Sequence, residues 1–529
     1  MNANTVPKAG RREWIGLGVL ALPSFLIGLA MTVLHLAVPY LSADLQPSSS
    51  QLLWIVDIYG FMIAGFLITM GRLGDRIGRR RLLLAGGAAF GLVSALAAFS
   101  PNAEMLIASR ALMGVAGATL MPSTLSLISS MFQDPTQRTL AISVWMMSLL
   151  SGTAVGPLAG GALLEFFWWG SVFLLAVPVM ALLLLLGPVL LPEFRDPRSG
   201  RLDPASVALS LAAILPAVYG LKEIAKDGPA WPPTLAIAAG FLVGVLFVRR
   251  QRRLADPLVD LGLLADRVFG GAMTTHVLSA FALYGMQFLI AQHLQLVLGL
   301  SPLKAGLWTL PGAVGGVVGP LLAPALVHII RPAFVISAAL ALGAAGFGIL
   351  TQVGEDSGLT VLVSGYAVTA LAVGLVATLT TDLIISAAPP EQAGAASGIE
   401  EAGIEFGIAM GVAVMGSVGI AVYRNRLAES IPTGIPPGAS QSAMDTLGGA
   451  VTAAGGLPGR TGAQLLDAAR EAFAQGLQLN AVIGLVVMVG LAILSAILLR
   501  VVPEYSDPDG RLDLERHGAR TQRGGHREK

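Results

Sequence analysis

The stretch "GRLGDRIGRRRLLLAGG" (residues 71–87) separates two long apolar runs and mixes glycines with charges of both signs. A basic connector at a membrane surface would account for its arginines. It would not account for Gly71, Gly74 and Gly78 around Asp75, because small residues are needed where a short turn packs closely against helix ends. Asp75 can cap a helix or pair with an arginine in such a turn. The stretch therefore predicts a tightly packed turn between two membrane helices.

The composition around this turn is that of a polytopic membrane protein. Of the 529 residues, 54% are hydrophobic and 12% are charged, and the mean hydropathy is +0.74. A soluble domain carries about 25% charged residues. The net charge of +1 does not suggest a nucleic-acid partner, and the lack of cysteine excludes disulfides, thiolate metal sites and cysteine nucleophiles. The basic start followed by a long apolar run indicates an uncleaved first helix.

Fourteen runs approach the length of about 20 apolar residues that a helix needs to cross the hydrocarbon core. We place them at 14–38, 52–71, 82–99, 103–127, 139–164, 167–190, 203–221, 231–248, 268–298, 305–328, 333–353, 358–385, 396–423 and 477–500. An even number of spans puts both termini on one side, and most of the 33 Lys and Arg residues fall on that side. The few on the other side include those at 222–226, which we assign to a loop. The positive-inside rule then predicts that both termini are cytoplasmic.

Three further motifs lie inside the predicted spans. The segment "SGTAVGPLAGGALLE" (151–165) holds a proline that bends a helix and glycines that admit a close neighbour, as ordinary small-residue packing also would. The segments "LLWIVDIYGFMIAG" (52–65) and "RALMGVAGATLMPSTLSLI" (110–128) carry Asp57 and Arg110. Since a buried arginine seldom lacks a partner, these charges indicate either a structural ion pair or a proton-linked network.

With these motifs the chain resembles the major facilitator superfamily, and with fourteen spans it is similar to the drug:proton antiporters that export quaternary ammonium compounds and dyes from bacteria. In that family the loop between spans 2 and 3 latches the two halves on the cytoplasmic side, and a glycine–proline signature in span 5 marks exporters. The residues that match the loop signature are Gly71, Leu73, Asp75, Arg76, Gly78, Arg79 and Arg80. Those that match the exporter signature are Gly152, Gly156, Pro157, Gly160 and Gly161.

The resemblance covers nearly the whole chain and implies an all-α membrane protein of the major facilitator fold, with 14 transmembrane helices. It implies the following domains: a cytoplasmic N-terminus (1–13), a six-helix bundle (14–190), a linker region with spans 7 and 8 (191–267), a second six-helix bundle (268–500) with an external loop (424–476), and a cytoplasmic tail (501–529). A faint likeness between "GTAVGPLAGG" (152–161) and "GGVVGPLLAP" (315–324) either reflects repeated bundles or arises by chance.

The segment "GIEEAGIEFG" (398–407) places Glu400, Glu401 and Glu405 in span 13, where the family carries an acidic cluster. Each ionised carboxylate facing lipid would cost about 2.5–3.5 kcal/mol, so these groups must face a cavity, be protonated or be paired. At about 100° per residue, Glu401 and Glu405 lie about 40° apart on one face. A separate stripe, which Glu400 overlies, consists of Gly403, Gly407 and Gly411. The cluster either binds protons and cations in the central cavity or lies at the cytoplasmic interface.

Two positions depart from the family pattern. Ala30 stands where many members carry an acid in span 1, with His35 nearby, and span 10 has no acid. Both absences favour monovalent over dicationic substrates. Ser143 also replaces the first glycine of the exporter signature, which is a minor change.

These features predict proton-coupled export of hydrophobic, cationic drugs or dyes across the bacterial cytoplasmic membrane, a function associated with antibiotic resistance. The alternative is export of an endogenous lipid or secondary metabolite, which would share every motif. The sequence shows no spacing typical of a catalytic metal or of a nucleophile with a base, and no GxxxxGK[ST] segment, so an enzyme and a nucleotide-driven pump are not expected. The expected partners are hydrophobic small molecules, protons and the lipid bilayer, without cofactor, metal, nucleotide or nucleic acid.

Overall fold

A computed structural model of the chain describes residues 8–195, 203–254, 257–327, 329–354, 358–388 and 393–499. The described residues form helices and no strand, and 14 of these helical segments are long and apolar enough to cross a membrane. The all-α membrane class predicted from the sequence is therefore confirmed. The predicted tail at 501–529 lies outside the described residues.

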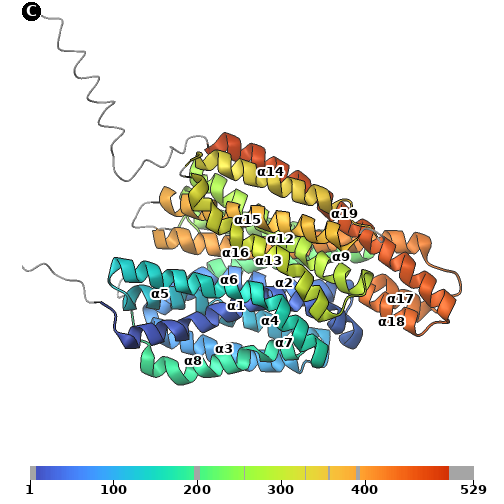
Figure 1. Cartoon of the computed structure of the whole chain (residues 1–529), viewed down its shortest axis with the longest axis horizontal. Coiled ribbons are helices and arrows are strands. Elements are labelled where there is room, and N and C mark those ends of the chain that lie inside the picture. Colours follow the sequence, from blue (N-terminus) through green and yellow to red (C-terminus); the bar gives the residue numbers. More distant parts are fainter. Residues whose placement is uncertain are drawn as a thin grey trace, which may run out of the picture.

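The N-terminal bundle fills the lower half of Figure 1. Its helices are α1 (Arg11–Leu45), α2 (Ser49–Ile77), α3 (Arg79–Ala98), α4 (Ala103–Gly117), α5 (Leu120–Met131), α6 (Pro135–Phe166), α7 (Ser171–Leu174) and α8 (Ala176–Leu190). The fourth predicted span is thus two helices, because the chain leaves the α-helix at Ala118 and Thr119 before α5 begins.

The C-terminal bundle lies above the first one in Figure 1. It consists of α12 (Arg267–Gln292) with its π-helical extension η1 (His293–Val297), α13 (Pro302–Val327), α14 (Pro332–Leu350), α15 (Leu359–Ala387), α16 (Ala393–Ser430), α17 (Pro437–Asp445), α18 (Leu447–Gly455) and α19 (Gly459–Leu498). The predicted loop at 424–476 is mostly helical: α16 and α19 extend into it, and α17 and α18 lie between them.

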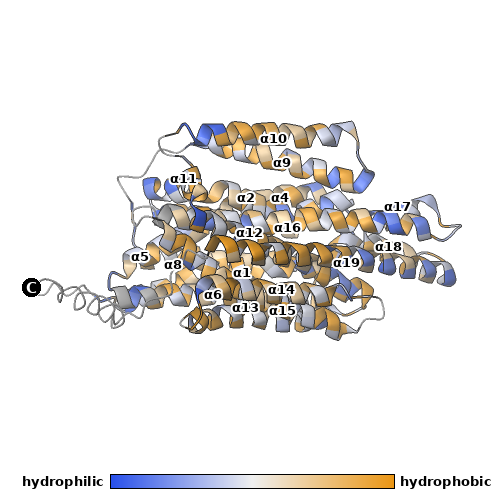
Figure 2. Ribbon diagram, turned by 90° about the horizontal axis from the view of Figure 1, so that it is seen from above, coloured by the Kyte–Doolittle hydropathy of each residue, from blue (hydrophilic) through white to orange (hydrophobic). Residues whose placement is uncertain are grey.

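Two helices stand between the bundles in sequence, α9 (Pro204–Asp227) and α10 (Trp231–Gln251), followed by the short α11 (Leu261–Ala265). The antiparallel pair lies at the margin of the assembly in Figure 2, and its helices are largely orange between bluer ends. α9 packs against α2 and α16, where Phe61, Val218, Ala409 and Ala413 form a small apolar core. The inserted pair therefore contacts the seam between the two bundles.

The two ends of the helices define two faces of the molecule. We call the end with the α2–α3 turn (Ile77–Arg79) and the start of α1 the basic face, and the end with α17 and α18 the loop face. In Figure 1 the labels α5 and α8 lie toward the basic face, and the labels α17 and α18 mark the loop face.

Glycines spaced four residues apart hold one helix pair together in each bundle. A Cβ at Gly152 or Gly156 of α6 would overlap backbone or side-chain atoms of α1, and a Cβ at Gly407 or Gly411 of α16 would overlap the backbone of α12. Small residues allow such close approach between membrane helices. The stripe predicted on span 13 is therefore a helix-packing face.

The faint likeness between 152–161 and 315–324 joins two helices that lie in different bundles. These segments lie in α6 and α13, which pack against each other, with the Pro157 carbonyl where a Cβ on Gly306 would sit. The shared geometry is instead between the α1–α6 and α12–α16 pairs.

We predict that Gly152→Ala lowers the melting temperature of the detergent-purified protein, because overpacking the α1–α6 contact costs about 1–3 kcal/mol. The matched control is Gly18→Ala on α1, where an added Cβ meets nothing within 4 Å. The control should melt at or slightly above the wild-type temperature, since Ala favours the helix over Gly. Equal melting of both variants would contradict the packing role of Gly152.

Candidate functional site

A cavity of about 680 Å³ lies between the two bundles at the basic face. We call it the vestibule. Its walls come from α2 and α5 of the first bundle, from α16 of the second, and from the segment before α11. The lining residues include Ile68, Arg72, Asp75, Ser126, Asp260, Ser397 and Glu401. Glu401 is thus brought to a roomy, partly polar space rather than to lipid.

A second, much smaller cavity of about 40 Å³ lies deeper along the same seam. We call it the inner cavity. It brings together three predicted site residues from three helices, Asp57, Arg110 and Glu405, and its lining also includes His35 and Tyr59. Glu405 is one helical turn further along α16 than Glu401. The two acids that the helical periodicity places on one face therefore line two successive cavities.

Asp57 is already paired inside the protein. The Lys222 ammonium lies 2.9 Å from Asp57 Oδ1 and 2.7 Å from Oδ2, and both side chains are 0% exposed. The same ammonium lies 3.6 Å from the centroid of the Trp54 ring. The sequence interpretation that placed Lys222 in a loop was wrong, because α9 continues to Asp227 and carries the lysine inward.

In the part of the chain that the structure describes, the Arg110 guanidinium is hydrogen-bonded to backbone carbonyls and forms no ion pair with a carboxylate. Its guanidinium donates to the Ile55 carbonyl at 3.0 Å and to the Val56 carbonyl at 3.2 Å. It also lies 4.5 Å from the centroid of the Tyr59 ring. These contacts join α4 to α2 and place a fixed positive charge beside the inner cavity, so the expected ion pair is replaced by carbonyl and ring contacts.

Glu400 faces away from both cavities and is 4% exposed. Its Oε1 accepts a hydrogen bond from the Thr381 hydroxyl on α15 and lies 3.2 Å from His276 Nδ1 on α12. The contact with His276 has the length of an ion pair but not the angles of a hydrogen bond. Glu400 therefore ties α16 to two neighbouring helices, in keeping with its predicted place over the packing stripe.

The turn between α2 and α3 is packed as its glycines predict. Gly78 adopts a φ of 115°, a backbone conformation that L side chains rarely adopt. Arg79 Nε donates to Asp75 Oδ1 at 2.8 Å, and the Arg79 amide donates to the Phe194 carbonyl at 2.9 Å. Arg80 Nη1 donates to the Leu191 carbonyl at 2.9 Å. These bonds hold the turn to the end of α8 and leave Asp75 on the wall of the vestibule.

The rest of the predicted loop signature also clusters at this turn. Gly71 lines the vestibule beside Pro122 of α5, and the Arg72 guanidinium donates to the Pro257 carbonyl at 2.9 Å. Arg76 lies on the exposed surface of α2. Within the exporter signature, Gly160 packs against Val33 of α1, and Gly161 packs against the start of α13. The signature thus joins α6 to both bundles.

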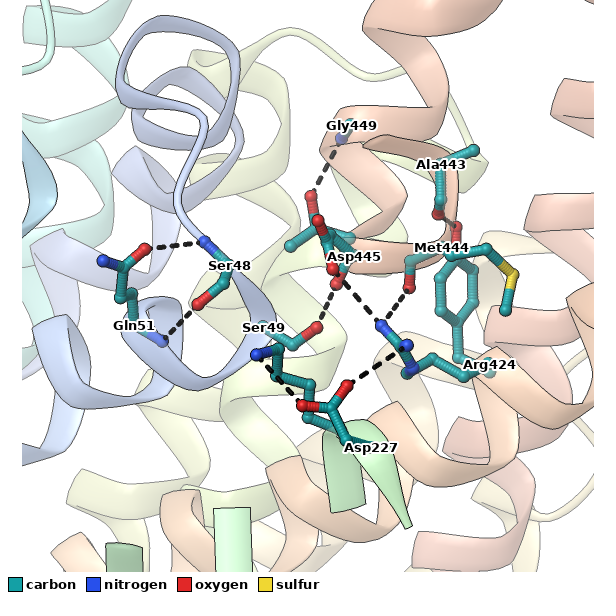
Figure 3. Close-up of polar contacts among 12 residues, drawn as sticks. Ser48, Ser49, Gln51, Asp227, Arg424, Ala443, Met444, Asp445 and Gly449 are labelled. Carbon is teal, nitrogen blue, oxygen red and sulfur yellow. Dashed lines mark hydrogen bonds and ion pairs between the residues drawn. The ribbon is translucent and has the colours of Figure 1, made fainter. Parts of the chain in front are cut away.

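Polar contacts across the seam close the loop face (Figure 3). The Ser49 hydroxyl at the start of α2 donates to the Asp445 carbonyl at the end of α17. Within the second bundle, Arg424 of α16 lies 3.2 Å from Asp445 Oδ1 of α17, and it also lies 3.8 Å from Asp227 Oδ1 of the inserted helix α9. Gln295 Nε2 of η1 also donates to the Leu36 carbonyl of α1 at 3.1 Å. The seam is therefore joined at the loop face and hollow at the basic face.

This arrangement, with two bundles, a vestibule between them and acids on one of the seam helices, is that of a membrane transporter. The chain belongs to the Major Facilitator Superfamily, whose family profile matches residues 20–412. It is 44% identical over 489 residues to the multidrug efflux pump LfrA of Mycolicibacterium smegmatis, covering 92% of this chain and 97% of that protein. It is 37% identical over 471 residues to the methyl viologen resistance protein SmvA of Salmonella typhimurium, covering 87% and 93%.

The solved structures that resemble this one support the fold. A bacterial homologue of the human lysosomal transporter Spinster, in an inward-facing and unoccupied conformation, superposes with a TM-score of 0.62 at 15% identity. The likeness covers 93% of this chain and 98% of that chain. The predicted family and fold are therefore confirmed.

We predict that Ser126→Cys and Ser397→Cys, which line the vestibule, react with a membrane-impermeant thiol reagent added at the basic face. The native chain contains no cysteine, so each variant carries one reactive thiol. The control is Ser279→Cys on α12, which is 0% exposed and should stay unlabelled. Faster labelling of the vestibule thiols from the loop face would contradict this geometry.

Proposed function

We propose that this transporter exports hydrophobic cations from the cytoplasm in exchange for protons. The observation that carries the proposal is the placement of Glu401 in the vestibule and Glu405 in the inner cavity, one turn apart on α16. The relatives support the substrate class, since one is a multidrug efflux pump and another confers resistance to methyl viologen, a dication.

The positive-inside rule makes the basic face cytoplasmic, so that the vestibule faces the cytoplasm of the bacterium. A hydrophobic cation can then enter beside the apolar side chains of Leu67, Ile68 and Ile399 and meet the Glu401 carboxylate. Because a carboxylate cannot hold a proton and pair with a cation at once, loading of the cation displaces the proton. That competition is the coupling step of antiport.

The other charges along the seam are already engaged. Glu400 is held by Thr381 and His276, and Asp57 is neutralised by Lys222. Arg110 is bound to carbonyls of α2, and its side chain lines the same inner cavity as Glu405. Glu401 and Glu405 are therefore the two acids that we assign to exchange.

Alternating access would follow from rocking of one bundle against the other. The cytoplasmic vestibule would close while the contacts of Ser49 and Gln295 between the bundles at the loop face separate. The Asp75–Arg79 pair lies on the vestibule wall, where closure would bring the α16 side of the seam toward it. We assign the α2–α3 turn a role in this conformational equilibrium rather than in substrate binding.

We predict that Glu401→Gln and Glu405→Gln each abolish uphill efflux of ethidium driven by a proton gradient, because the amide keeps the shape but cannot exchange a proton. Binding of ethidium should depend less on pH between about 5.5 and 8.5 in each purified variant than in the wild type, and the double variant should lose this dependence, since no proton then competes. The matched control is Glu471→Gln, an exposed glutamate on α19. Efflux by the wild type that persists when an uncoupler dissipates the gradient at constant ATP would overturn proton antiport.

An exporter of an endogenous metabolite would share this geometry, and a substrate panel in the same proteoliposomes separates the two functions. Glu400→Gln provides an internal comparison, since its carboxylate faces α12 and α15. Loss of pH dependence in Glu400→Gln alone would show that the wrong face of α16 had been assigned to exchange.

We predict that Asp75→Asn leaves ethidium affinity close to that of the wild type but slows turnover, because the change weakens the pair with Arg79 without altering the acids of the cavities. The measurement is the rate of ethidium efflux at equal amounts of inserted protein, together with equilibrium binding. Wild-type turnover would contradict the gating role, and a large loss of affinity would instead place Asp75 in the binding site.

A further inference from the structure

The Lys222 ammonium occupies a cation site built by α2. Trp54 and Asp57 lie three residues apart and project from the same side of that helix, so that the ring and the carboxylate meet the ammonium together. An aromatic face with a carboxylate is a recurrent way in which proteins hold ammonium ligands. The lysine enters this site from α9, which belongs to neither bundle.

Stability alone does not explain why charges occupy this position. A buried ion pair is commonly no more stabilising than apolar residues of similar volume, because both ions lose their hydration. The apolar core of Phe61, Val218 and Ala409 already joins α9 to α2 and α16 beside the pair. The buried charges of Asp57 and Lys222 therefore need a functional explanation, namely the binding of a cation at this position.

We propose that Lys222 is a tethered cation that fills a Trp54–Asp57 binding site for small alkylammonium groups and so withholds Asp57 from substrate. Asp57 lines the same inner cavity as Glu405, so a free Asp57 would provide that cavity with a second carboxylate. Lys222 then determines how many positive charges the cavity accepts. This consequence for selectivity rests on the proposed export of cations, whereas the existence of the site does not.

The direct test is thermal melting of purified Lys222→Ala in ethylammonium chloride, compared with sodium chloride at equal ionic strength. The variant lacks the resident ammonium, so ethylammonium should raise its melting temperature in a saturable manner. The wild type should show no such rise, because its site is filled. The Asp57→Asn/Lys222→Ala double variant should show none either, because the carboxylate is gone. The matched control is Lys226→Ala, one turn further on α9, where the lysine pairs at the surface with Glu223 and Asp227.

A response of Lys222→Ala no larger than that of the wild type would overturn the proposal, as would an equal response of the double variant. If Lys222→Ala folds only when ethylammonium is present during purification, that requirement is itself the expected rescue. Failure to fold with and without ethylammonium, while the double variant folds, would show that the pair is structural and overturn the site.

The functional test compares the affinities of purified protein for methyl viologen, a dication, and ethidium, a monocation. Lys222→Met should raise the ratio of methyl viologen to ethidium affinity by about tenfold, the size of one added favourable charge contact. The Asp57→Asn/Lys222→Met variant should return the ratio to the wild-type value. An unchanged ratio in Lys222→Met would refute the selectivity role. If the wild type shows no proton-driven export of ethidium, the proposed function is refuted. The melting test of the Trp54–Asp57 site is not affected by that result.

Discussion

A charge placed in the hydrocarbon layer without a partner costs about 2.5–3.5 kcal/mol on the insertion scale, and the arrangement of this molecule depends on how that cost is avoided. Asp57 is matched by Lys222, Arg110 by carbonyls of α2, and Glu400 by Thr381 and His276. Glu401 and Glu405 are accommodated differently, because they line cavities along the seam. The side chains that we propose for exchange are thus distinguished from the other buried charges by what surrounds them.

The glycine stripe of α16 makes this distinction possible. Gly407 and Gly411 bring the backbone of α16 against that of α12, which fixes the rotation of the helix. Since each residue turns the helix by about 100°, neighbouring carboxylates at 400 and 401 point to different surroundings. One is buried among helices of its own bundle, and the other faces the seam. The packing of the glycine face of α16 against α12 therefore determines which of the two glutamates faces the seam.

The helical spans and the faces of single helices could be predicted from local sequence. Contacts between helices that are distant in the sequence could not. Apolar length revealed the spans, and the spacing of glycines and glutamates revealed the faces of α16. Hydropathy averages over a window, so Lys222 at the end of an apolar run looked like a loop residue. Its partner Asp57 lies 165 positions away in sequence, and the pairing depends on how α9 docks against α2. The helices α17 and α18 escaped prediction because their residues are rich in glycine and small side chains, which favour the helix weakly outside tertiary packing.

The contacts between the bundles at the loop face differ in kind from those deeper in the seam, and this difference bears on how the bundles can move. At the loop face, the Ser49 hydroxyl of α2 donates to the Asp445 carbonyl of α17, and Gln295 Nε2 of η1 donates to the Leu36 carbonyl of α1 at 3.1 Å. Deeper in the seam, Gly60 of α2 meets Ala409 of α16, and the Leu53 side chain of α2 packs against Gly416 of α16. Both of these hydrogen bonds between the bundles at the loop face join uncharged groups, so their separation would leave no unmatched charge in the membrane interior. In the proposed exchange, Glu401 and Glu405 lie on the vestibule side of that motion, where a bound proton or cation would neutralise them as the space around them closes.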